Sequence, residues 1–250
     1  MLTPEQIDTF FSQGYLVLPN FCSEQQWQGI RDFAEQQLQS RAVPVELESD
    51  LEYPGAPTKE NDAAETIRRL KQVVDRSPII RDWATSNQVA SVLKSLLPSP
   101  LYLVRAHHNC IMTKQPEFSS DSWWHQDLRY WRYSEGNLVS TWLALGEENE
   151  RNGGLMVIPG SHKWSYQPHQ FDSNLFFRQD LPENQALLEQ KVKLTLNPGD
   201  LLLFHCRTLH AATRNYTDQT KMAAVFTYRT ESDTPIEGSR SAESEDLKLS

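Results

Sequence analysis

From residue 101 to residue 228 the chain is a succession of short apolar runs, each ended by residues that form tight turns. The turns carry Asn152-Gly153-Gly154, Pro159-Gly160 and Asn197-Pro198-Gly199, in which Gly and Pro supply backbone conformations that long helices do not use. Many short strands spaced in this way are typical of a sandwich or barrel. The chain is therefore expected to fold as a mainly β domain. The runs span residues 101–112, 138–145, 155–158, 192–196, 201–205 and 222–228.

The first hundred residues add helices to this β domain. Capping-box patterns at Thr3–Gln6 and Ser23–Gln26 predict two helix N-termini, each followed by apolar residues at helical spacing. A strand is expected at residues 15–18, one or two helices at residues 79–97, and a loop at residues 41–62. The N-terminal part is thus predicted to flank the sheets as helical decoration.

The length of the chain sets the number of domains. With 250 residues it can bury one sizeable core, so a single domain is expected over residues 1–230. Residues 231–250 are rich in acids and serine, with little that can pack. They are expected to form a frayed polar tail, with a lid over a site as the alternative.

Charge and cysteine content limit the partners and the compartment. The formal net charge of −9 repels phosphate backbones and anionic membranes, so neither nucleic acid nor a membrane is an expected partner. No apolar run reaches the roughly 18 residues of a membrane span, and the first residues lack the pattern of a signal peptide. Cys22, Cys110 and Cys206 have no CxxC spacing, and their odd number cannot complete a disulfide framework. We expect a soluble cytoplasmic protein, whose oligomeric state the sequence leaves open.

One short motif suggests a metal centre. His125 and Asp127 are separated by one residue, and strand periodicity places such side chains on the same face, where an imidazole and a carboxylate can meet one cation. A second histidine from elsewhere in the chain would complete a facial triad, which leaves three octahedral positions of an Fe(II) ion open. Alone, a His-x-Asp pair is more often a surface pair than a ligand set.

Two histidines further along the chain are candidates for the third ligand. His205 ends the apolar run that begins at Leu201, which is typical of a buried histidine with a structural hydrogen bond. His210 precedes the small residues Ala211 and Ala212, which leave room beside a metal. We therefore predict His210 as the third ligand.

These segments resemble the phytanoyl-CoA dioxygenase family. The matching motifs are Trp124-His125-Gln126-Asp127-Leu128, Trp142-Leu143-Ala144-Leu145, Asn152-Gly153-Gly154-Leu155, Ile158-Pro159-Gly160-Ser161-His162-Lys163 and the stretch from Gly199-Asp200 to His210. Several motifs in the same order are far more specific than any one of them. The resemblance covers roughly residues 1–230, and it implies a double-stranded β-helix, a cupin-like jelly roll with flanking helices.

The resemblance also implies the chemistry. His125, Asp127 and His210 would bind Fe(II), with 2-oxoglutarate as the cosubstrate and O2 as the oxidant, and the expected reaction is hydroxylation of a small-molecule substrate. A carboxylate at Asp127 argues against halogenation, because related halogenases carry a small residue there. Trp142 matches a family position near the cosubstrate, and Cys110, on the strand before the metal motif, is a second candidate for cofactor binding. A large aromatic or a cysteine on a strand is as readily a core residue.

One position departs from the family pattern. An Arg about eleven residues after the distal histidine usually holds the far carboxylate of 2-oxoglutarate as a bidentate fork, and this chain has Lys221 there. A lysine keeps the positive charge without the fork, so Lys221 is the predicted cosubstrate residue with an altered affinity. The alternative is a solvated lysine at a strand end.

Residues beside the metal motif are candidates for the substrate wall. They precede the motif on the neighbouring strand or surround it, and each is also compatible with simple packing. The candidates are His108, Trp123, Arg129, Tyr130 and Trp131.

Two other functions stay open at this level. The departure at Lys221 is compatible with a jelly-roll protein that binds a metal or a ligand but has lost turnover. A cupin-like dioxygenase that needs no cosubstrate is the third reading, with Lys221 merely structural. The sequence does not identify the substrate, and it contains no separate motif for a CoA ester.

Overall fold

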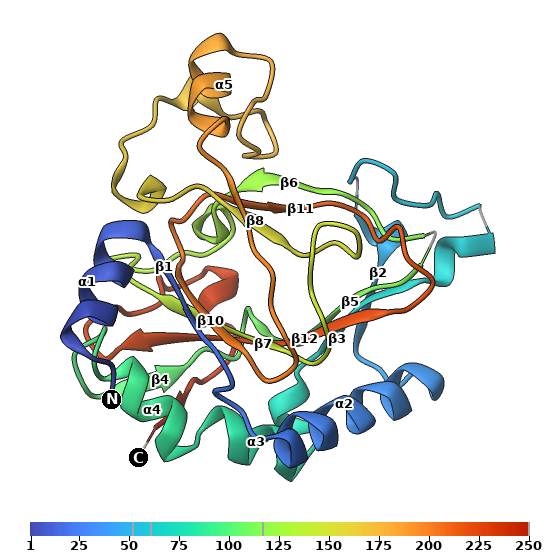
Figure 1. Cartoon of the computed structure of the whole chain (residues 1–250), viewed down its shortest axis with the longest axis horizontal. Coiled ribbons are helices and arrows are strands. Elements are labelled where there is room, and N and C mark those ends of the chain that lie inside the picture. Colours follow the sequence, from blue (N-terminus) through green and yellow to red (C-terminus); the bar gives the residue numbers. More distant parts are fainter. Residues whose placement is uncertain (52, 61, 117, 250) are drawn as a thin grey trace.

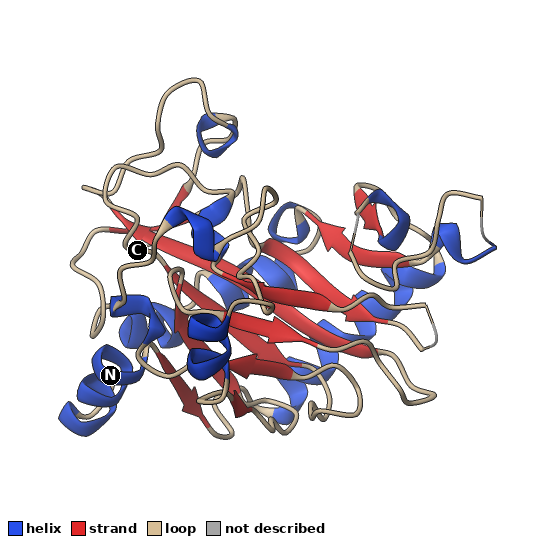
Figure 2. Cartoon of the chain, turned by 90° about the horizontal axis from the view of Figure 1, so that it is seen from above, coloured by secondary structure: helices blue, strands red, loops and turns tan. Residues whose placement is uncertain are grey.

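The architecture is a sandwich of two antiparallel sheets. The computed structural model describes residues 1–51, 53–60, 62–116 and 118–249. The larger sheet has the order β1-β10-β7-β12-β5-β3-β2, with β4 paired to β12 and β13 paired to β4, and the smaller sheet has the order β6-β11-β8-β9. Figure 1 shows the smaller sheet lying over the larger one, and Figure 2 shows the strands running through the middle of the molecule. The predicted mainly β jelly roll with flanking helices is confirmed.

The elements have the following bounds. The strands are β1 (Tyr15–Leu18), β2 (Val45–Leu47), β3 (Ile67–Lys71), β4 (Leu101–Leu103), β5 (Asn109–Lys114), β6 (Ser122–His125), β7 (Val139–Ala144), β8 (Leu155–Val157), β9 (Val192–Lys193), β10 (Leu201–His205), β11 (His210–Ala212), β12 (Lys221–Thr230) and β13 (Leu247–Lys248). The α-helices are α1 (Pro4–Gln13), α2 (Glu24–Gln39), α3 (Pro78–Ala84), α4 (Asn87–Leu93) and α5 (Pro182–Leu188).

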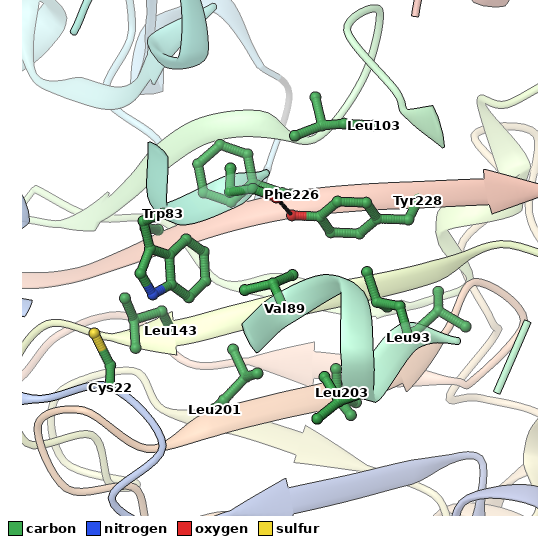
Figure 3. Close-up of a cluster of buried hydrophobic side chains, with 14 of the residues drawn as sticks. Cys22, Trp83, Val89, Leu93, Leu103, Leu143, Leu201, Leu203, Phe226 and Tyr228 are labelled. Carbon is green, nitrogen blue, oxygen red and sulfur yellow. Dashed lines mark hydrogen bonds between the residues drawn. The ribbon is translucent and has the colours of Figure 1, made fainter. Parts of the chain in front are cut away.

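Helices α2, α3 and α4 cover the outer face of the larger sheet (Figure 1). In Figure 3 the side chains of Trp83, Val89 and Leu93 from α3 and α4 pack against apolar residues of β7, β10 and β12. Tyr228 on β12 is fully buried there, and its hydroxyl donates a hydrogen bond of 2.7 Å to the carbonyl of Ala84. Burial of these side chains fixes the helices on the sheet and so leaves the opposite face of the sheet for the site.

The second core lies between the two sheets. Alternate residues of the larger sheet point inward, and they pack with residues of β8 and β11 from the smaller sheet. Trp142, Leu202, Phe204 and Val225 belong to the larger sheet and lie in this layer. Strands β7, β10 and β12 are therefore buried almost throughout, which explains the long apolar stretches in their sequences.

The local predictions for the N-terminal part are confirmed with one exception. Both capping boxes are present, and Gly14 ends α1 with φ 81°, a left-handed conformation that glycine adopts without strain. The strand at Tyr15–Leu18 and the two helices α3 and α4 form where they were expected. Residues 41–62 are not simply a loop, because β2 and a 3-10 turn at Glu48–Asp50 lie within them. Residues 52 and 61 of this segment lie outside the described residues.

The prediction of a frayed C-terminal end is wrong for the described residues. Asp233 is fully buried, and its carboxylate accepts backbone hydrogen bonds from Glu135, Gly136 and Asn137. Further on, β13 pairs with β4 through Leu247. The side chain of Asp246 is likewise buried and pairs with Arg229 at 2.6 Å, whereas the four glutamates of the segment are exposed. The polar pattern alone does not distinguish the buried carboxylates from the solvated ones.

The described part of the chain contains no helix that is both long and apolar enough to cross a membrane. The predicted compartment remains a prediction.

Candidate active site

Three predicted metal ligands converge at one end of the smaller sheet. His125 ends β6, Asp127 begins the 3-10 turn Asp127–Arg129, and His210 begins β11. Strands β6 and β11 are neighbours, and His210 lies directly opposite His125 in the register. The ligand atoms of the three residues lie within 4.8 Å of one another. Strand periodicity predicted that His125 and Asp127 lie on one continuous strand. In the structure β6 ends at His125, and the 3-10 turn that follows directs the Asp127 carboxylate toward both imidazoles.

The two imidazoles are oriented for metal binding by backbone carbonyls. His125 Nδ1 lies 2.6 Å from the carbonyl of Trp123, and His210 Nδ1 lies 3.0 Å from the carbonyl of Thr208. A carbonyl only accepts, so each Nδ1 donates, and each ring presents its Nε2 atom to the metal position. The Nε2 atoms of His125 and His210 lie 3.9 and 3.7 Å from Asp127 Oδ1.

Burial of the three ligands favours the binding of a cation at this centre. Desolvation lowers the pKa of His125 well below its ordinary value, and the neighbouring His210 and Arg129 lower it further, so the ring stays neutral. Asp127 is 5% exposed, and its Oδ2 has no hydrogen-bond partner among the described residues. A buried carboxylate oxygen without a donor is costly, and a cation removes that cost. Two imidazoles and one carboxylate are the donor set of the non-haem Fe(II) facial triad.

The metal ligands line a cavity of about 40 Å³ between the sheets, called the inner cavity below. Trp142 and Lys221 line it too, as predicted for cosubstrate residues, whereas Cys110 is not among the described residues that do. Cys110 is buried in the core between the sheets, where desolvation raises the pKa of its thiol to about 11. The part of Lys221, Trp142 and Cys110 in cosubstrate binding stays a prediction.

Lys221 is not a solvated lysine at a strand end. Its amine forms an ion pair of 3.0 Å with Glu148, and both side chains are 1% exposed. Glu148 also accepts a hydrogen bond of 2.9 Å from the indole of Trp142, over whose ring the lysine amine lies at 4.7 Å. The positive charge of Lys221 is thus already neutralised by a carboxylate of the chain itself. Glu148 was missed in the sequence, where it is one of several acids in the loop after β7.

Three further basic residues line the inner cavity and were also missed in the sequence. Arg68 and Arg69 lie on β3 and Lys114 ends β5, and a local pattern gives no reason to expect them at a metal site. Arg68 pairs with Glu48 at 3.1 Å, and Arg69 pairs with Glu46 at 3.3 Å. The cavity is therefore lined by several buried basic side chains, most of which form ion pairs with glutamates.

A second cavity, of about 230 Å³, meets the first at the metal ligands. The predicted substrate residues His108, Arg129, Tyr130 and Trp131 line it, together with His107 and Arg240, which were not predicted. Trp123 is 41% exposed and is not among the described residues that line it. Desolvation lowers the pKa of His108 to about 4 and that of His107 to about 3, so neither ring carries charge at neutral pH.

Arg129 is the buried cation of this second cavity. It is 8% exposed, and its guanidinium lies 3.9 Å from the ring centre of Phe176 and 4.2 Å from that of Tyr130. It donates a hydrogen bond of 2.8 Å to the hydroxyl of Tyr53, and its Nε has no partner among the described residues. These aromatic faces hold the guanidinium in place, so that its free donor faces a fixed direction.

His205 has the structural environment that was expected for it. Its Nε2 lies 3.2 Å from the side-chain oxygen of Asn137, and its Nδ1 accepts from the backbone of Arg207. Burial lowers the pKa of His205 to about 3. The group of potential ligands found among the described residues contains His210 and not His205.

Comparison with known proteins agrees with this site. The model of the phytanoyl-CoA dioxygenase family matches residues 10–223. The chain is 25% identical to the ectoine dioxygenase of Sphingopyxis alaskensis, covering 91% of this chain and 76% of that protein. It is 25% identical to the human peroxisomal phytanoyl-CoA dioxygenase, covering 87% of this chain and 65% of that protein.

Solved structures have the same fold. EctD from S. alaskensis in its apo form superposes with a TM-score of 0.76 at 23% identity, covering 94% of this chain and 80% of that one. The carbocyclase SnoK of nogalamycin biosynthesis gives a TM-score of 0.75 at 19% identity, covering 100% of this chain and 97% of that one. Among the matches, the epimerase SnoN is in complex with Fe3+ and α-ketoglutarate.

Proposed function

The chain belongs to the phytanoyl-CoA dioxygenase family of non-haem Fe(II) and 2-oxoglutarate-dependent dioxygenases, and on this premise we propose that it hydroxylates a small or medium-sized organic metabolite. The observation that supports this proposal is the meeting of two cavities at one triad. The basic lining of the inner cavity suits the carboxylates of a cosubstrate chelated to the metal, and the second cavity suits a substrate that approaches the same metal from the other side.

The three residues of the triad would supply the protein ligands of the iron. His125 and His210 would offer their Nε2 atoms and Asp127 its carboxylate to Fe(II), and a metal held by only three side chains can also bind a cosubstrate and O2. When bound, Fe(II), 2-oxoglutarate and O2 supply the oxidising chemistry, in which one oxygen atom enters succinate and the other the substrate. Because Asp127 fills a metal position with a carboxylate, we propose hydroxylation rather than halogenation.

The chain positions the substrate and shields the centre from water. His108, Arg129, Tyr130 and Trp131 form the proposed substrate wall. Trp131 is 4% exposed, and its ring contacts both His107 and His108, which fixes the apolar part of the wall. A substrate held against such a wall presents one C–H bond to the metal, and position rather than acid–base chemistry decides which bond reacts.

The charge of the wall favours a substrate with an acidic group. Arg129 has no carboxylate within ion-pair distance among the described residues, and neither has Arg240, which is exposed at the edge of the same cavity. Arg69 is paired with Glu46, and His107 and His108 are neutral. We propose that a carboxylate or another anionic group of the substrate binds Arg129, whose planar fork suits such groups.

Anaerobic titration of the Fe(II)-loaded protein with 2-oxoglutarate tests the core of the proposal. A visible charge-transfer band that saturates, and that is absent in His210→Ala, is the expected result. Succinate must then form with O2, faster when the substrate is present. Iron binding without the band or succinate would favour the alternative of a metal- or ligand-binding protein without turnover. Oxygen uptake that does not need 2-oxoglutarate would contradict the proposed cosubstrate.

The substrate class is tested by screening matched pairs of compounds. Small carboxylic acids and their amides are compared for stimulation of succinate formation, and acids are expected to be the better substrates. Arg129→Met should abolish this preference, whereas Arg132→Met, at an exposed arginine nearby, should leave it unchanged. Equal turnover of acids and amides by the unmodified chain would refute the proposed acidic group.

A further inference from the structure

Among the described residues that line the inner cavity, the basic side chains outnumber the glutamates with which they pair. Of the four cationic side chains that line it, Arg68, Arg69 and Lys221 are each paired with a glutamate. Lys114, the fourth, has no carboxylate within 4.0 Å among the described residues. Asp127 is a metal ligand and is therefore not available to balance it. Lys114 is thus the basic side chain of this cavity that has no ion-pair partner among the described residues.

Lys114 is buried, so the lack of a carboxylate partner is costly. Its side chain is 5% exposed, and its amine donates a hydrogen bond to the carbonyl of Ser120. Desolvation lowers the pKa of Lys114 well below its ordinary value, and the cations Arg68 and Lys221 lower it further, while the carboxylates of Glu48 and Asp121 offset part of the effect. A buried amine without a counter-ion is expensive, and an anion delivered by a ligand removes that expense.

Lys114 and Lys221 are neighbours on the wall of this cavity. They lie opposite each other in the register of β5 and β12, and their side chains share one face of the sheet. A ligand carboxylate that reaches this part of the wall meets both residues. At Lys221 it meets a cation that Glu148 already neutralises, so two carboxylates would share one amine. At Lys114 the same carboxylate completes a one-to-one pair.

We infer that Lys114, rather than Lys221, binds the distal carboxylate of 2-oxoglutarate, while Glu148 holds Lys221 as a neutral part of the cavity wall. The inference rests on the proposed function, because it concerns the cosubstrate of the same site. It assigns a specificity-determining role to Lys114 and a structural role to the pair of Glu148 and Lys221. The indole of Trp142 supports that structural role by donating to Glu148.

Calorimetric titration of the protein loaded with Mn(II), which binds oxygen ligands without starting turnover, tests the inference. The probes are 2-oxoglutarate and 2-oxopentanoate, which has the same chain length but lacks the distal carboxylate. Loss of a hydrogen bond to a charged group corresponds to a change of about 10- to 150-fold in affinity. Lys114→Met is expected to weaken the binding of 2-oxoglutarate by that factor. Its affinity for 2-oxopentanoate is expected to stay within about threefold of that of the unmodified chain.

The double variant Glu148→Gln/Lys221→Met provides the matched control. It removes the Lys221 amine without leaving a buried glutamate unpaired, and Gln retains an acceptor for the Trp142 indole. Its affinity for 2-oxoglutarate is expected to stay within about threefold of the unmodified chain. Loss of 2-oxoglutarate binding in the folded double variant overturns the inference, whether or not Lys114→Met also binds poorly.

The remaining outcomes are equally decisive. If Lys114→Met binds both probes as the unmodified chain does, the inference is wrong. If Lys114→Met does not fold, the double variant still decides, because retention of binding excludes Lys221 as the anchor and loss establishes it. If the unmodified Mn(II)-loaded chain binds 2-oxopentanoate but not 2-oxoglutarate, the cosubstrate of the proposed function fails. That result differs from a failure of Lys114 alone.

Discussion

The buried pair of Glu148 and Lys221 makes a quantitative prediction about stability. Both side chains are 1% exposed and their charged atoms are 3.0 Å apart, so removing one partner leaves the other uncompensated in the interior. Breaking a buried pair in this way costs about 3–5 kcal/mol. The single variant Lys221→Met is therefore expected to lower the free energy of unfolding by about that amount.

The cost of protonating Glu148 gives a similar magnitude for the loss of stability. In Lys221→Met the orphaned carboxylate keeps one donor, the indole of Trp142, and can otherwise become neutral by taking up a proton. Protonating an ordinary glutamate at pH 7 costs about 4 kcal/mol, which limits the penalty from above. A domain of this size loses roughly 2–4 °C of thermal midpoint for each kcal/mol, so a drop of about 6–16 °C is expected.

Urea and thermal unfolding at pH 7 measure this directly. The double variant Glu148→Gln/Lys221→Met should regain most of the lost stability, because neither remaining side chain is charged. A single variant that loses less than about 1 kcal/mol would refute the reasoning. A double variant no more stable than the single one would refute it equally, since the cost would then come from packing rather than from charge.

Three further predictions follow from other parts of the molecule. Asp127→Asn should weaken Mn(II) binding, measured by calorimetry, by more than the roughly 10- to 100-fold that follows the loss of an outer-sphere partner. Asp121→Asn, which removes an ion pair with Arg214, should leave the Mn(II) affinity unchanged. Because burial lowers the pKa of His205 from 6.5 to about 3, its contribution to stability is complete above pH 6.5 and is lost as the pH falls toward about 3. His205→Gln should therefore flatten the pH dependence of unfolding between those limits by about 1 kcal/mol per pH unit, and an unchanged slope would contradict the assignment. Tyr228→Phe leaves the carbonyl of Ala84 without its donor and should cost about 1–2 kcal/mol in urea unfolding; no change would mean that another group replaces the hydroxyl.

The sequence determined the class of fold because its signals are local. Capping boxes, turn glycines and short apolar runs act over a few residues, and the structure contains the elements that they predict at α1, α2, β1 and β10. The same holds for His125 and Asp127, which are close along the chain. His210 was found from its small neighbours together with the family motif, and the pairing of β6 with β11 brings it opposite His125.

Elements without such local signals were missed. Strand β3 and helix α5 have no clear period, and residues 231–249 read as solvated although several of them are buried. A carboxylate such as Asp233 is buried because three backbone donors surround it, and these donors come from a loop far away in the chain. Composition describes the average environment of a residue type, not the particular donors that one fold brings to it.

The sequence by itself determined the jelly roll, the metal ligands and the family to which they belong. Only the tertiary structure decided which charges of the site are free. Glu148 meets Lys221 across 73 positions of sequence, while Lys114, directly opposite Lys221 in the sheet, has no such partner among the described residues. Electrostatic pairing depends on distance in space and on exclusion of water, and both exist only after the sheets have closed over the cavity.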